Sequence, residues 1–575
     1  QVVLAAWKHF PGQGLWQQNG SAVAHDLDLT NAQTLQDKIG MASCQECDVG
    51  QLIWLLYQQE GMGFLDSLRG QFGFAIWDDA ASTFLVATDP YGIRPVVYAN
   101  IPKALVAGTR IRQLFHYPGL NCEINPEAIY HYLFFEAIPT PVTIYKGVHK
   151  LEPGSVLVAA NGKLRRHVYY DIRYRPEANS SESYWTKKIF SEVDTAVSRF
   201  VPHSNPDKTG CYLSGGTDSS SVSGLYTKHA GRPAKTFSIG FDDAHYNELD
   251  YAHLAARQFG TEQHDYFVTP KDVLELLQVL PELYDEPFGN SSVVPAFFCA
   301  KAAKEAGVDV LLGGDGGDEI FGGNERYVTN LVFEAYHKIP ALARRRLLEP
   351  ALGLFPDKGL PYKAKRYVRR ANIPNPERFY SYNLLAEISP WDVFNQDFMA
   401  QVDPDCFLKL AQAHYDRAAP AHVTDRLLYL DMKFTITDND LRKVTQMAEA
   451  AGIWPQYPLL DRDLVDFTAT IPPGLKVKWK RNRYIFKQAM KGFLPQEIIS
   501  KKKHGMGLPV TPWFKQDPQM NALLHDTLFN GTPHLSKYMK PEFIQKMKTS
   551  FERDESTYFG DNLWVFLILE MWLQQ

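Results

Sequence analysis

The chain has 575 residues, of which 45% are hydrophobic and 22% charged, and it carries a formal net charge of −5. Such a length suits about two to four globular domains, and the slight acidity excludes a general attraction to nucleic acid or to anionic membranes. No uninterrupted apolar run reaches the length of a membrane span, and six cysteines are too few for a disulfide framework. The first eight residues lack a signal-peptide pattern, so we expect a cytoplasmic protein.

Residues 1–170 consist of short apolar runs separated by turn residues, with helical pieces between them. This rhythm predicts an α+β domain with packed sheets. The polar residues 171–185 predict a linker. The expected strands are 72–77, 83–87, 95–98 and 155–158, and the expected helices are 49–59 and 126–135.

From residue 186 the pattern changes to strands that alternate with helices, and strands are expected at 210–213, 234–241 and 308–312. This alternation predicts an α/β domain over 186–575, built on a doubly wound parallel sheet and mainly helical after about residue 330. Ligands of such sheets bind at the carboxyl ends of the strands.

The first of these strands runs directly into a glycine-rich loop at residues 214–220 (SGGTDSS). Two glycines let backbone N–H groups approach an anion closely, and the N-terminus of the following helix adds partial positive charge. Ser214, Ser219 and Ser220 supply hydroxyl donors, and Asp218 can hold Mg²⁺. The loop therefore indicates a pyrophosphate cradle that differs from the Walker loop, with a chance glycine-rich turn as the alternative.

The third strand also ends in a glycine-rich loop with acids, at residues 313–323 (GGDGGDEIFGG). Asp315 and Asp318 lie in a turn that can face the first loop. Asp218 and Asp318 together suit a hard Mg²⁺ ion that is shared with phosphate oxygens. The alternative is an acidic surface turn that only caps the next helix, but two such loops in one parallel sheet favour a site.

Motifs along almost the whole chain resemble those of the asparagine synthetase family, whose relatives include β-lactam synthetases and lasso-peptide cyclases. The resemblance implies an N-terminal class II glutaminase-like (Ntn-type) domain followed by a PP-loop ATP pyrophosphatase domain. Besides the two loops, the matching segments are 70–78 (GQFGFAIWD), 89–95 (DPYGIRP), 143–154 (TIYKGVHKLEPG), 237–241 (FSIGF), 285–287 (DEP), 457–461 (YPLLD), 483–487 (RYIFK) and 501–509 (KKKHGMGLP).

The resemblance also implies roles for individual residues, with ATP and Mg²⁺ as cofactors. Asp218 and Asp318 are the implied metal ligands. Lys503 matches a lysine that neutralises charge on phosphate, although a run of three lysines is also typical of a solvated surface. Asp315 takes the place of a family glutamate or tyrosine and is a candidate base for the attacking amine. The implied ATP and pyrophosphate contacts are Leu213, Ser214, Gly215, Gly216, Asp218, Ser219, Ser220, Ile239 and Gly314.

Two departures from the family pattern concern the glutaminase and the pocket. The glutaminase nucleophile is an N-terminal cysteine, whereas this chain begins at Gln1 and has its first cysteine at Cys44. The internal glutaminase motifs are missing as well, so we expect a domain without glutaminase activity. Trp454 and Gln456 replace a family glutamate and arginine. These replacements are consistent with a rearranged pocket, and simple core packing of Trp454 is the alternative.

The leading hypothesis is an ATP-dependent amide ligase that adenylates a carboxylate, releases pyrophosphate and transfers the acyl group to an amine or ammonia. The carboxylate is a small molecule or a peptide, and a homodimer is possible in this family. The alternatives are a glutamine-dependent asparagine synthetase, an intramolecular macrolactam or β-lactam synthetase, and a non-catalytic nucleotide-binding homologue.

Overall fold

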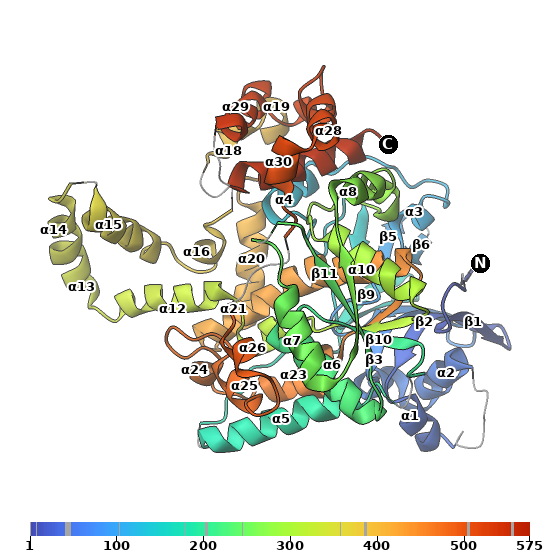
Figure 1. Ribbon diagram of the computed structural model, residues 1–575. Coiled ribbons are helices and arrows are strands. Elements are labelled where there is room, and N and C mark those ends of the chain that lie inside the picture. Colours follow the sequence, from blue (N-terminus) through green and yellow to red (C-terminus); the bar gives the residue numbers. More distant parts are fainter. Residues whose placement is uncertain are drawn as a thin grey trace.

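The computed structural model describes the chain except for residues 1, 7, 41–47, 103, 179, 202–204, 244, 357, 384–387, 503–506 and 554–556, and except for the side chains of residues 557 and 558. Two antiparallel sheets come first in the chain, and a parallel sheet with many helices follows (Figure 1). This arrangement confirms the predicted fold class.

The N-terminal part contains a six-stranded antiparallel sheet in the order β1-β2-β3-β4-β8-β9 and a smaller sheet in the order β6-β5-β7. Helix α2 packs its apolar side chains Leu52, Ile53 and Leu56 against Phe72 and Phe74 of the large sheet. The elements are β1 Gln13–Gln18, β2 Ser21–Leu29, α1 Ala32–Lys38, α2 Val49–Glu60, η1 Gly61–Ser67, β3 Gly70–Asp78, β4 Thr83–Thr88, β5 Val97–Ile101, β6 Ala104–Gly108, α3 Ile111–Leu114, α4 Pro126–Phe135, β7 Val148–Lys150, β8 Ser155–Ala160 and β9 Lys163–Val168.

The second part is built on a five-stranded parallel sheet in the order β12-β11-β10-β13-β14. Its strands are β10 Thr209–Tyr212, β11 Lys235–Gly240, β12 Glu262–Phe267, β13 Val310–Leu312 and β14 Trp454–Gln456. The three predicted strands are present as β10, β11 and β13, whereas β12 and β14 were not predicted. Because the strand order reverses between β10 and β13, their carboxyl ends form the switch point where ligands of such sheets bind.

Helices cover both faces of the parallel sheet, because successive side chains of a strand point to opposite faces. Leu312 packs with Val222 and Leu225 of α6, whereas Leu311 packs with Ala300 and Ala303 of α10. The helices around this sheet are α5 Glu182–Ser198, α6 Thr217–Ala230, α7 Leu249–Phe259, α8 Pro270–Leu277, α9 Leu280–Leu283, α10 Val293–Glu305, α11 Gly317–Phe321, α21 Val423–Asp431, η3 Met432–Asp440 and α22 Leu441–Ala450.

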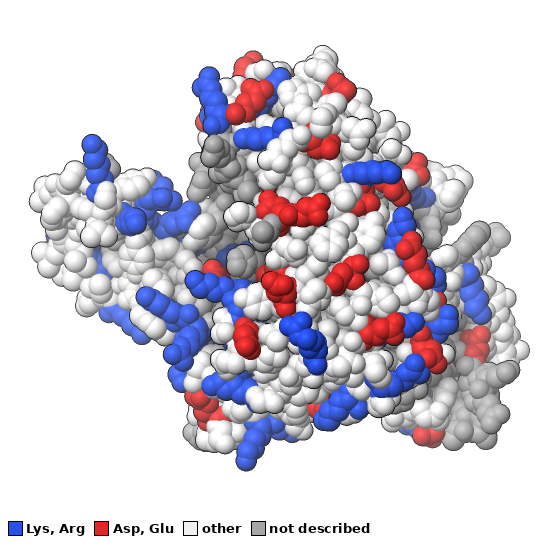
Figure 2. Space-filling model, in the orientation of Figure 1, with Lys and Arg blue, Asp and Glu red and all other residues white. Residues whose placement is uncertain are grey.

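An arm of helices extends from the body of the molecule between α12 and α15 (Figure 1). Lysine and arginine side chains gather on this arm (Figure 2). Its elements are α12 Glu325–His337, α13 Ala341–Ala343, η2 Arg344–Leu348, α14 Glu349–Gly353 and α15 Gly359–Ala371. None of the described residues among 327–372 lines the cavities described below.

The remaining helices complete the C-terminal half of the chain. Among the residues whose placement is described, no helix is long and apolar enough to cross a membrane. The elements are α16 Glu377–Tyr380, α18 Pro390–Val393, α19 Gln396–Met399, α20 Cys406–Arg417, η4 Pro458–Leu460, α23 Arg462–Thr468, α24 Pro473–Lys476, α25 Tyr484–Ala489, α26 Gln496–Ser500, α27 Val510–Gln516, α28 Pro518–Leu528, η5 His534–Lys537, α29 Pro541–Arg553 and α30 Thr557–Leu573.

The polar segment 171–185, which we predicted to be a linker, packs against the second part. The backbone N–H groups of Arg175 and Glu177 donate to the carbonyl oxygens of Ala469 and Thr470. Helix α5 already begins at Glu182, where the Ser181 hydroxyl caps it by accepting from the Tyr184 N–H. The described residues of 171–185 are therefore packed against the second part or belong to α5.

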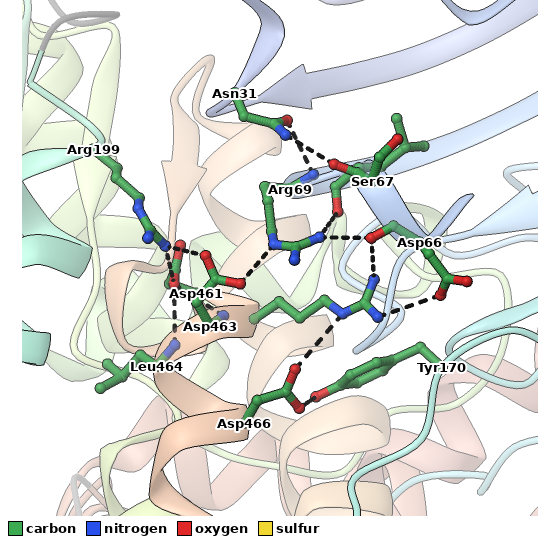
Figure 3. Close-up of polar contacts among 12 residues, drawn as sticks. Asn31, Asp66, Ser67, Arg69, Tyr170, Arg199, Asp461, Asp463, Leu464 and Asp466 are labelled. Atoms are coloured by element: carbon green, nitrogen blue, oxygen red, sulfur yellow. Dashed lines mark hydrogen bonds and ion pairs between the residues drawn. The ribbon is translucent and has the colours of Figure 1, made fainter. Parts of the chain in front are cut away.

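A cluster of charged side chains joins the end of η1 to α23 (Figure 3). The Arg69 Nε donates to Asp463 at 2.8 Å, and the Tyr170 hydroxyl donates to Asp466 at 3.0 Å. Arg199, which belongs to the end of α5, ion-pairs with both Asp461 and Asp463 (Figure 3). These contacts fix the N-terminal sheets against the parallel-sheet part.

Trp454 and Gln456 contribute to a second contact between the two parts. Asp28 Oδ2, on β2, accepts from Trp454 Nε1 at 2.8 Å, from Gln456 Nε2 at 2.7 Å and from Gln71 Nε2 at 3.1 Å. The Arg94 guanidinium lies 3.6 Å from the centre of the Trp454 ring. The two residues that depart from the family pattern therefore hold the domains together, and neither of them lines the cavity at the switch point.

We predict that Asp28→Ala destabilises the protein by at least about 2 kcal/mol, because it leaves three buried donors without their charged acceptor. Urea unfolding measures this loss. The exposed Asp37→Asn is the control, since among the described residues the Asp37 carboxylate accepts a hydrogen bond only from Gln33 within α1. Equal urea concentrations at the unfolding midpoints of the two variants would show that the Asp28 contact does not stabilise the protein.

Candidate functional site

The loop after β10 is folded tightly against α7. Gly215 has φ +66°, and a Cβ atom at this position would lie 2.4 Å from the Ala252 backbone nitrogen. The Ser219 hydroxyl holds the turn, because it accepts from the Ser214 N–H at 3.2 Å and lies 3.0 Å from the Ser214 hydroxyl. Helix α6 begins at Thr217. Its first N–H groups therefore face the loop as partial positive charge.

The loop after β13 lies directly on the loop after β10. A Cβ atom on Gly314 would lie 2.7 Å from the Ser219 backbone nitrogen, and one on Gly317 would lie 2.5 Å from the Asp218 carboxylate. Such close approach excludes any side chain at either glycine. The structure thus confirms that the two glycine-acid loops face each other.

Two carboxylates, one from each loop, converge on the guanidinium of Arg483. Its Nη2 lies 2.7 Å from Asp218 Oδ2, and its Nε donates to Asp318 Oδ1 at 2.7 Å. Arg483 is buried, and these two carboxylates raise its pKa further above the usual value even though burial alone lowers it. Arg483 belongs to the family segment 483–487, but nothing in that segment predicts which residues the arginine contacts.

The same convergence tests whether the loops suit Mg²⁺. The carboxylate oxygens of Asp218 and Asp318 are hard donors, and both contact the same positive group, the Arg483 guanidinium. Mg²⁺ in nucleotide sites is held by one or two carboxylates together with phosphate oxygens. No cluster of three or more metal-binding side chains occurs among the described residues. The donor set therefore fits a metal that is shared with a phosphate ligand.

A cavity of about 260 Å³ opens between the two loops. Gly215 and Ser220 do not line it, because Gly215 lies against α7 and Ser220 is buried within α6. Lys503 lies outside the described residues. The predicted residues that line the cavity are Leu213, Ser214, Gly216, Asp218, Ser219, Ile239, Gly314, Asp315 and Asp318.

Several basic side chains line the cavity on the side of α25 and α26. Lys501 ion-pairs with Glu248 at 3.2 Å and donates to the Ser214 carbonyl oxygen at 3.3 Å. Burial and the neighbouring Arg483 lower the pKa of Lys487. Because these lysines come from segments far from the loops in sequence, sequence reasoning did not assign them to the site. Together they supply the positive charge that a polyphosphate needs.

Asp315 occupies a charged corner of this cavity. Burial, and then the neighbouring Asp440 carboxylate, raises the pKa of Asp315 to about 6, while Lys443 opposes the shift. Lys443 Nζ donates to Asp440 at 2.6 Å. A carboxylate of this pKa can accept a proton from an ammonium group near neutral pH. The sequence did not predict Asp440 and Lys443 as site residues, because η3 and α22 contain no recognisable motif.

Comparison with known proteins agrees with this geometry. Residues 192–574 match the family described as asparagine synthase, and residues 31–170 match a glutamine amidotransferase domain. Asparagine synthetase (glutamine-hydrolyzing) 1 of Bacillus subtilis is 26% identical over 507 residues, which are 88% of this chain and 77% of that protein.

Two further relatives extend the comparison. A putative asparagine synthetase (glutamine-hydrolyzing) of Mycobacterium tuberculosis is 27% identical over 542 residues, which are 91% of this chain and 79% of that protein. The amidase chry2 of Gibberella zeae is 22% identical over 525 residues, which are 85% of this chain and 76% of that protein.

We predict that Gly314→Ala weakens nucleotide binding, because the added methyl group would lie 2.7 Å from the Ser219 nitrogen and force the two loops apart. Titration with Mg·ATP measures the effect, which we expect to exceed tenfold in Kd. Gly474→Ala is the matched control, since a Cβ atom there meets nothing within 4 Å. Unchanged affinity in Gly314→Ala would refute the close contact of the loops.

Proposed function

The chain belongs to the asparagine synthase family and is an asparagine synthetase-like carbon–nitrogen ligase that uses ATP, and on this premise we propose that it forms an acyl-adenylate and transfers the acyl group to an amine or ammonia. The convergence of Asp218 and Asp318 across two touching loops is the observation that carries this proposal. In our proposal this site binds the pyrophosphate part of ATP and leaves the α-phosphorus open to attack by the substrate carboxylate.

The proposed first step breaks the bond between the α- and β-phosphates. A carboxylate oxygen of the acid substrate attacks the α-phosphorus, and pyrophosphate leaves. Ser214, Gly216 and Ser219 line the cavity and would donate hydrogen bonds to the leaving pyrophosphate. Asp218 and Asp318 would hold Mg²⁺, which neutralises phosphate charge when bound. Leu213 and Ile239 line the cavity where the adenine is expected.

In the second proposed step an amine nitrogen attacks the acyl carbonyl, and AMP leaves. The Asp315 carboxylate takes the proton that the nitrogen loses as the amide bond forms. The raised pKa of Asp315 supports this role. Lys487 and Lys501 lie on the phosphate side, and Lys503 keeps its predicted role of neutralising charge on phosphate.

The N-terminal domain bears on the source of the amine. A cavity of about 1300 Å³ lies beside the N-terminal sheets, and no cysteine from the described parts of the chain lines it. Cys44 and Cys47 lie outside the described residues. Because the internal glutaminase motifs are missing from the sequence of residues 1–170, we propose that the amine is not released from glutamine by this domain. The names of the bacterial relatives support the alternative of a glutamine-dependent asparagine synthetase, and release of glutamate from glutamine would establish it.

We predict that the protein catalyses ATP–pyrophosphate exchange in the presence of its acid substrate and that Asp318→Asn lowers the exchange rate at least about 100-fold. Asp318→Asn would weaken one of the two carboxylate ligands proposed for Mg²⁺, and with it the neutralisation of phosphate charge, for which effects of this size are typical. A panel of carboxylic acids, including aspartate, is assayed with labelled pyrophosphate. No exchange with any acid would remove the adenylation mechanism and leave a non-catalytic nucleotide-binding homologue.

We predict a different effect for Asp315→Asn, because this side chain acts on the amine rather than on ATP. Amide formation should fall at least about 100-fold, which is within the range of a lost general base. Exchange should fall far less. The two rates are measured on the same preparation, and an equal loss in both would show that Asp315 belongs to the nucleotide site instead.

A further inference from the structure

The outer part of the arm carries a strong excess of positive charge. We define the outer arm as residues 338–371, which contain α13, η2, α14 and α15. Ten of these residues are lysine or arginine and two are acidic, so the segment has a formal net charge of +8. Because the whole chain has a net charge of −5, the rest of the chain carries −13. The acidity of the chain as a whole therefore does not extend to this segment.

Several exposed basic side chains of the outer arm have no acidic partner. Glu349 is the acidic residue of the outer arm that the structure describes, and it accepts from the Tyr336 hydroxyl at 2.8 Å and from the Asn372 side chain at 3.0 Å. Within the described parts of the chain, the exposed residues of the outer arm that form no ion pair include Arg345, Arg346, Lys363, Arg366 and Arg369. Their charge is available to an anionic partner.

Large apolar side chains are exposed on the same segment. At the turn between α14 and α15 the exposed fractions are 89% for Leu354, 54% for Phe355 and 80% for Leu360. Single exposed apolar residues are ordinary, whereas a concentration of them marks an interaction site. Of the 18 large hydrophobic residues that are exposed in the described chain, eight lie in the outer arm: Ile339, Leu342, Leu347, Leu348, Leu354, Phe355, Leu360 and Tyr362.

An apolar stripe runs along α15 at the spacing of one helix face and consists of Leu360, Ala364, Tyr367 and Ala371. Towards the body, Tyr367 and Ala371 pack against Phe333 and Tyr336 of α12. At the outer end of the stripe Leu360 remains exposed. Lysine and arginine occupy other faces of the helix, at positions 363, 365, 366, 369 and 370. The outer arm therefore has an uncovered apolar surface beside a basic one.

The outer arm projects away from the rest of the molecule. Helices α13, α14 and α15 lie at the far end of the arm, beyond α12 (Figure 1). On the face shown in Figure 2, lysine and arginine side chains lie beside uncharged ones on this part of the arm. Because the arm projects, its apolar turn can reach a flat surface without a collision between that surface and the body.

The composition of the outer arm favours a lipid surface over other anionic partners. Leucine and phenylalanine beside lysine and arginine are typical of helices that lie in the interface of a membrane. Protein–protein interfaces are depleted in lysine, and leucine is under-represented among their hot spots. Nucleic acids are bound mainly through phosphate contacts, which do not require exposed leucine. Anionic headgroups complement the net charge of +8, and the boundary of the acyl chains accommodates the exposed apolar groups.

We propose that the outer arm binds the surface of a membrane that contains anionic lipids. Leu354, Phe355 and Leu360 enter the boundary between headgroups and acyl chains, and the basic side chains around them contact headgroup phosphates. The arm lies on the membrane and does not span it. This inference goes beyond the proposed amide-forming function and does not depend on it, because no described residue of the outer arm lines the ATP cavity.

Co-sedimentation of the full chain with lipid vesicles tests the proposal. We expect binding to phosphatidylcholine vesicles that contain about 30% phosphatidylglycerol, and at least about tenfold weaker binding to pure phosphatidylcholine vesicles, at about 0.15 M salt. The combined variant Lys363→Glu, Arg366→Glu and Arg369→Glu should weaken binding to the anionic vesicles at least about tenfold. The matched control should bind as wild type does, because it reverses three exposed lysines of the body: Lys187→Glu, Lys271→Glu and Lys546→Glu.

The apolar turn is tested separately. The combined variant Leu354→Ser, Phe355→Ser and Leu360→Ser should weaken binding to the anionic vesicles at least about fivefold, because it removes the groups that enter the bilayer. The control combines Val168→Ser with Val279→Ser, two exposed apolar residues of the body, and should bind as wild type does. Loss of binding in the charge variant with unchanged binding in the apolar variant would show a general attraction to polyanions and contradict insertion.

Other results would also overturn the proposal: no binding of wild type to the anionic vesicles, equal binding to both kinds of vesicle, or unchanged binding in the charge variant. A dimer that forms through the arm in sedimentation velocity, without vesicle binding, would assign the surface to a second copy of the chain. Circular dichroism checks the fold of each variant. If a combined variant does not fold, Leu354→Ser and Lys363→Glu decide singly, with at least about twofold weaker binding expected from each and equal binding excluding the proposal.

Discussion

The direct contact between the loops that follow β10 and β13 is the constraint on which the rest of the site depends. The two strands are neighbours in the parallel sheet, and Gly314 allows the second loop to reach the backbone of Ser219 in the first. Asp218 and Asp318 meet at Arg483 only because of this contact. Glycine at these positions is thus required by the space between two backbones.

Charge is organised around that contact in two opposed regions. Arg483, Lys487 and Lys501 supply basic groups on the side of α25 and α26, where our proposal puts the phosphates, and Asp315 and Asp440 supply acidic groups towards α22. Phosphate transfer and proton acceptance need these opposite environments within one cavity.

The sequence was sufficient for the strands at 210–213 and 308–312 and for the helices at 49–59 and 126–135, because apolar runs and turn residues are local signals. It was also sufficient for the two loops, whose glycines and acids are contiguous. It did not reveal Arg483 as the partner of Asp218, the Asp440–Lys443 pair, or the contact of Asp28 with Trp454. Each of these joins residues that are distant in the chain, and only the packing of the two parts brings them together.

A crystal structure with Mg²⁺ and α,β-methylene-ATP, which cannot be cleaved between its first two phosphates, would test the central claim most directly. The account predicts the β- and γ-phosphates against Ser214, Gly216 and Ser219, and a metal ion bound to Asp218 and Asp318. A nucleotide bound elsewhere, or a metal that contacts neither aspartate, would contradict it.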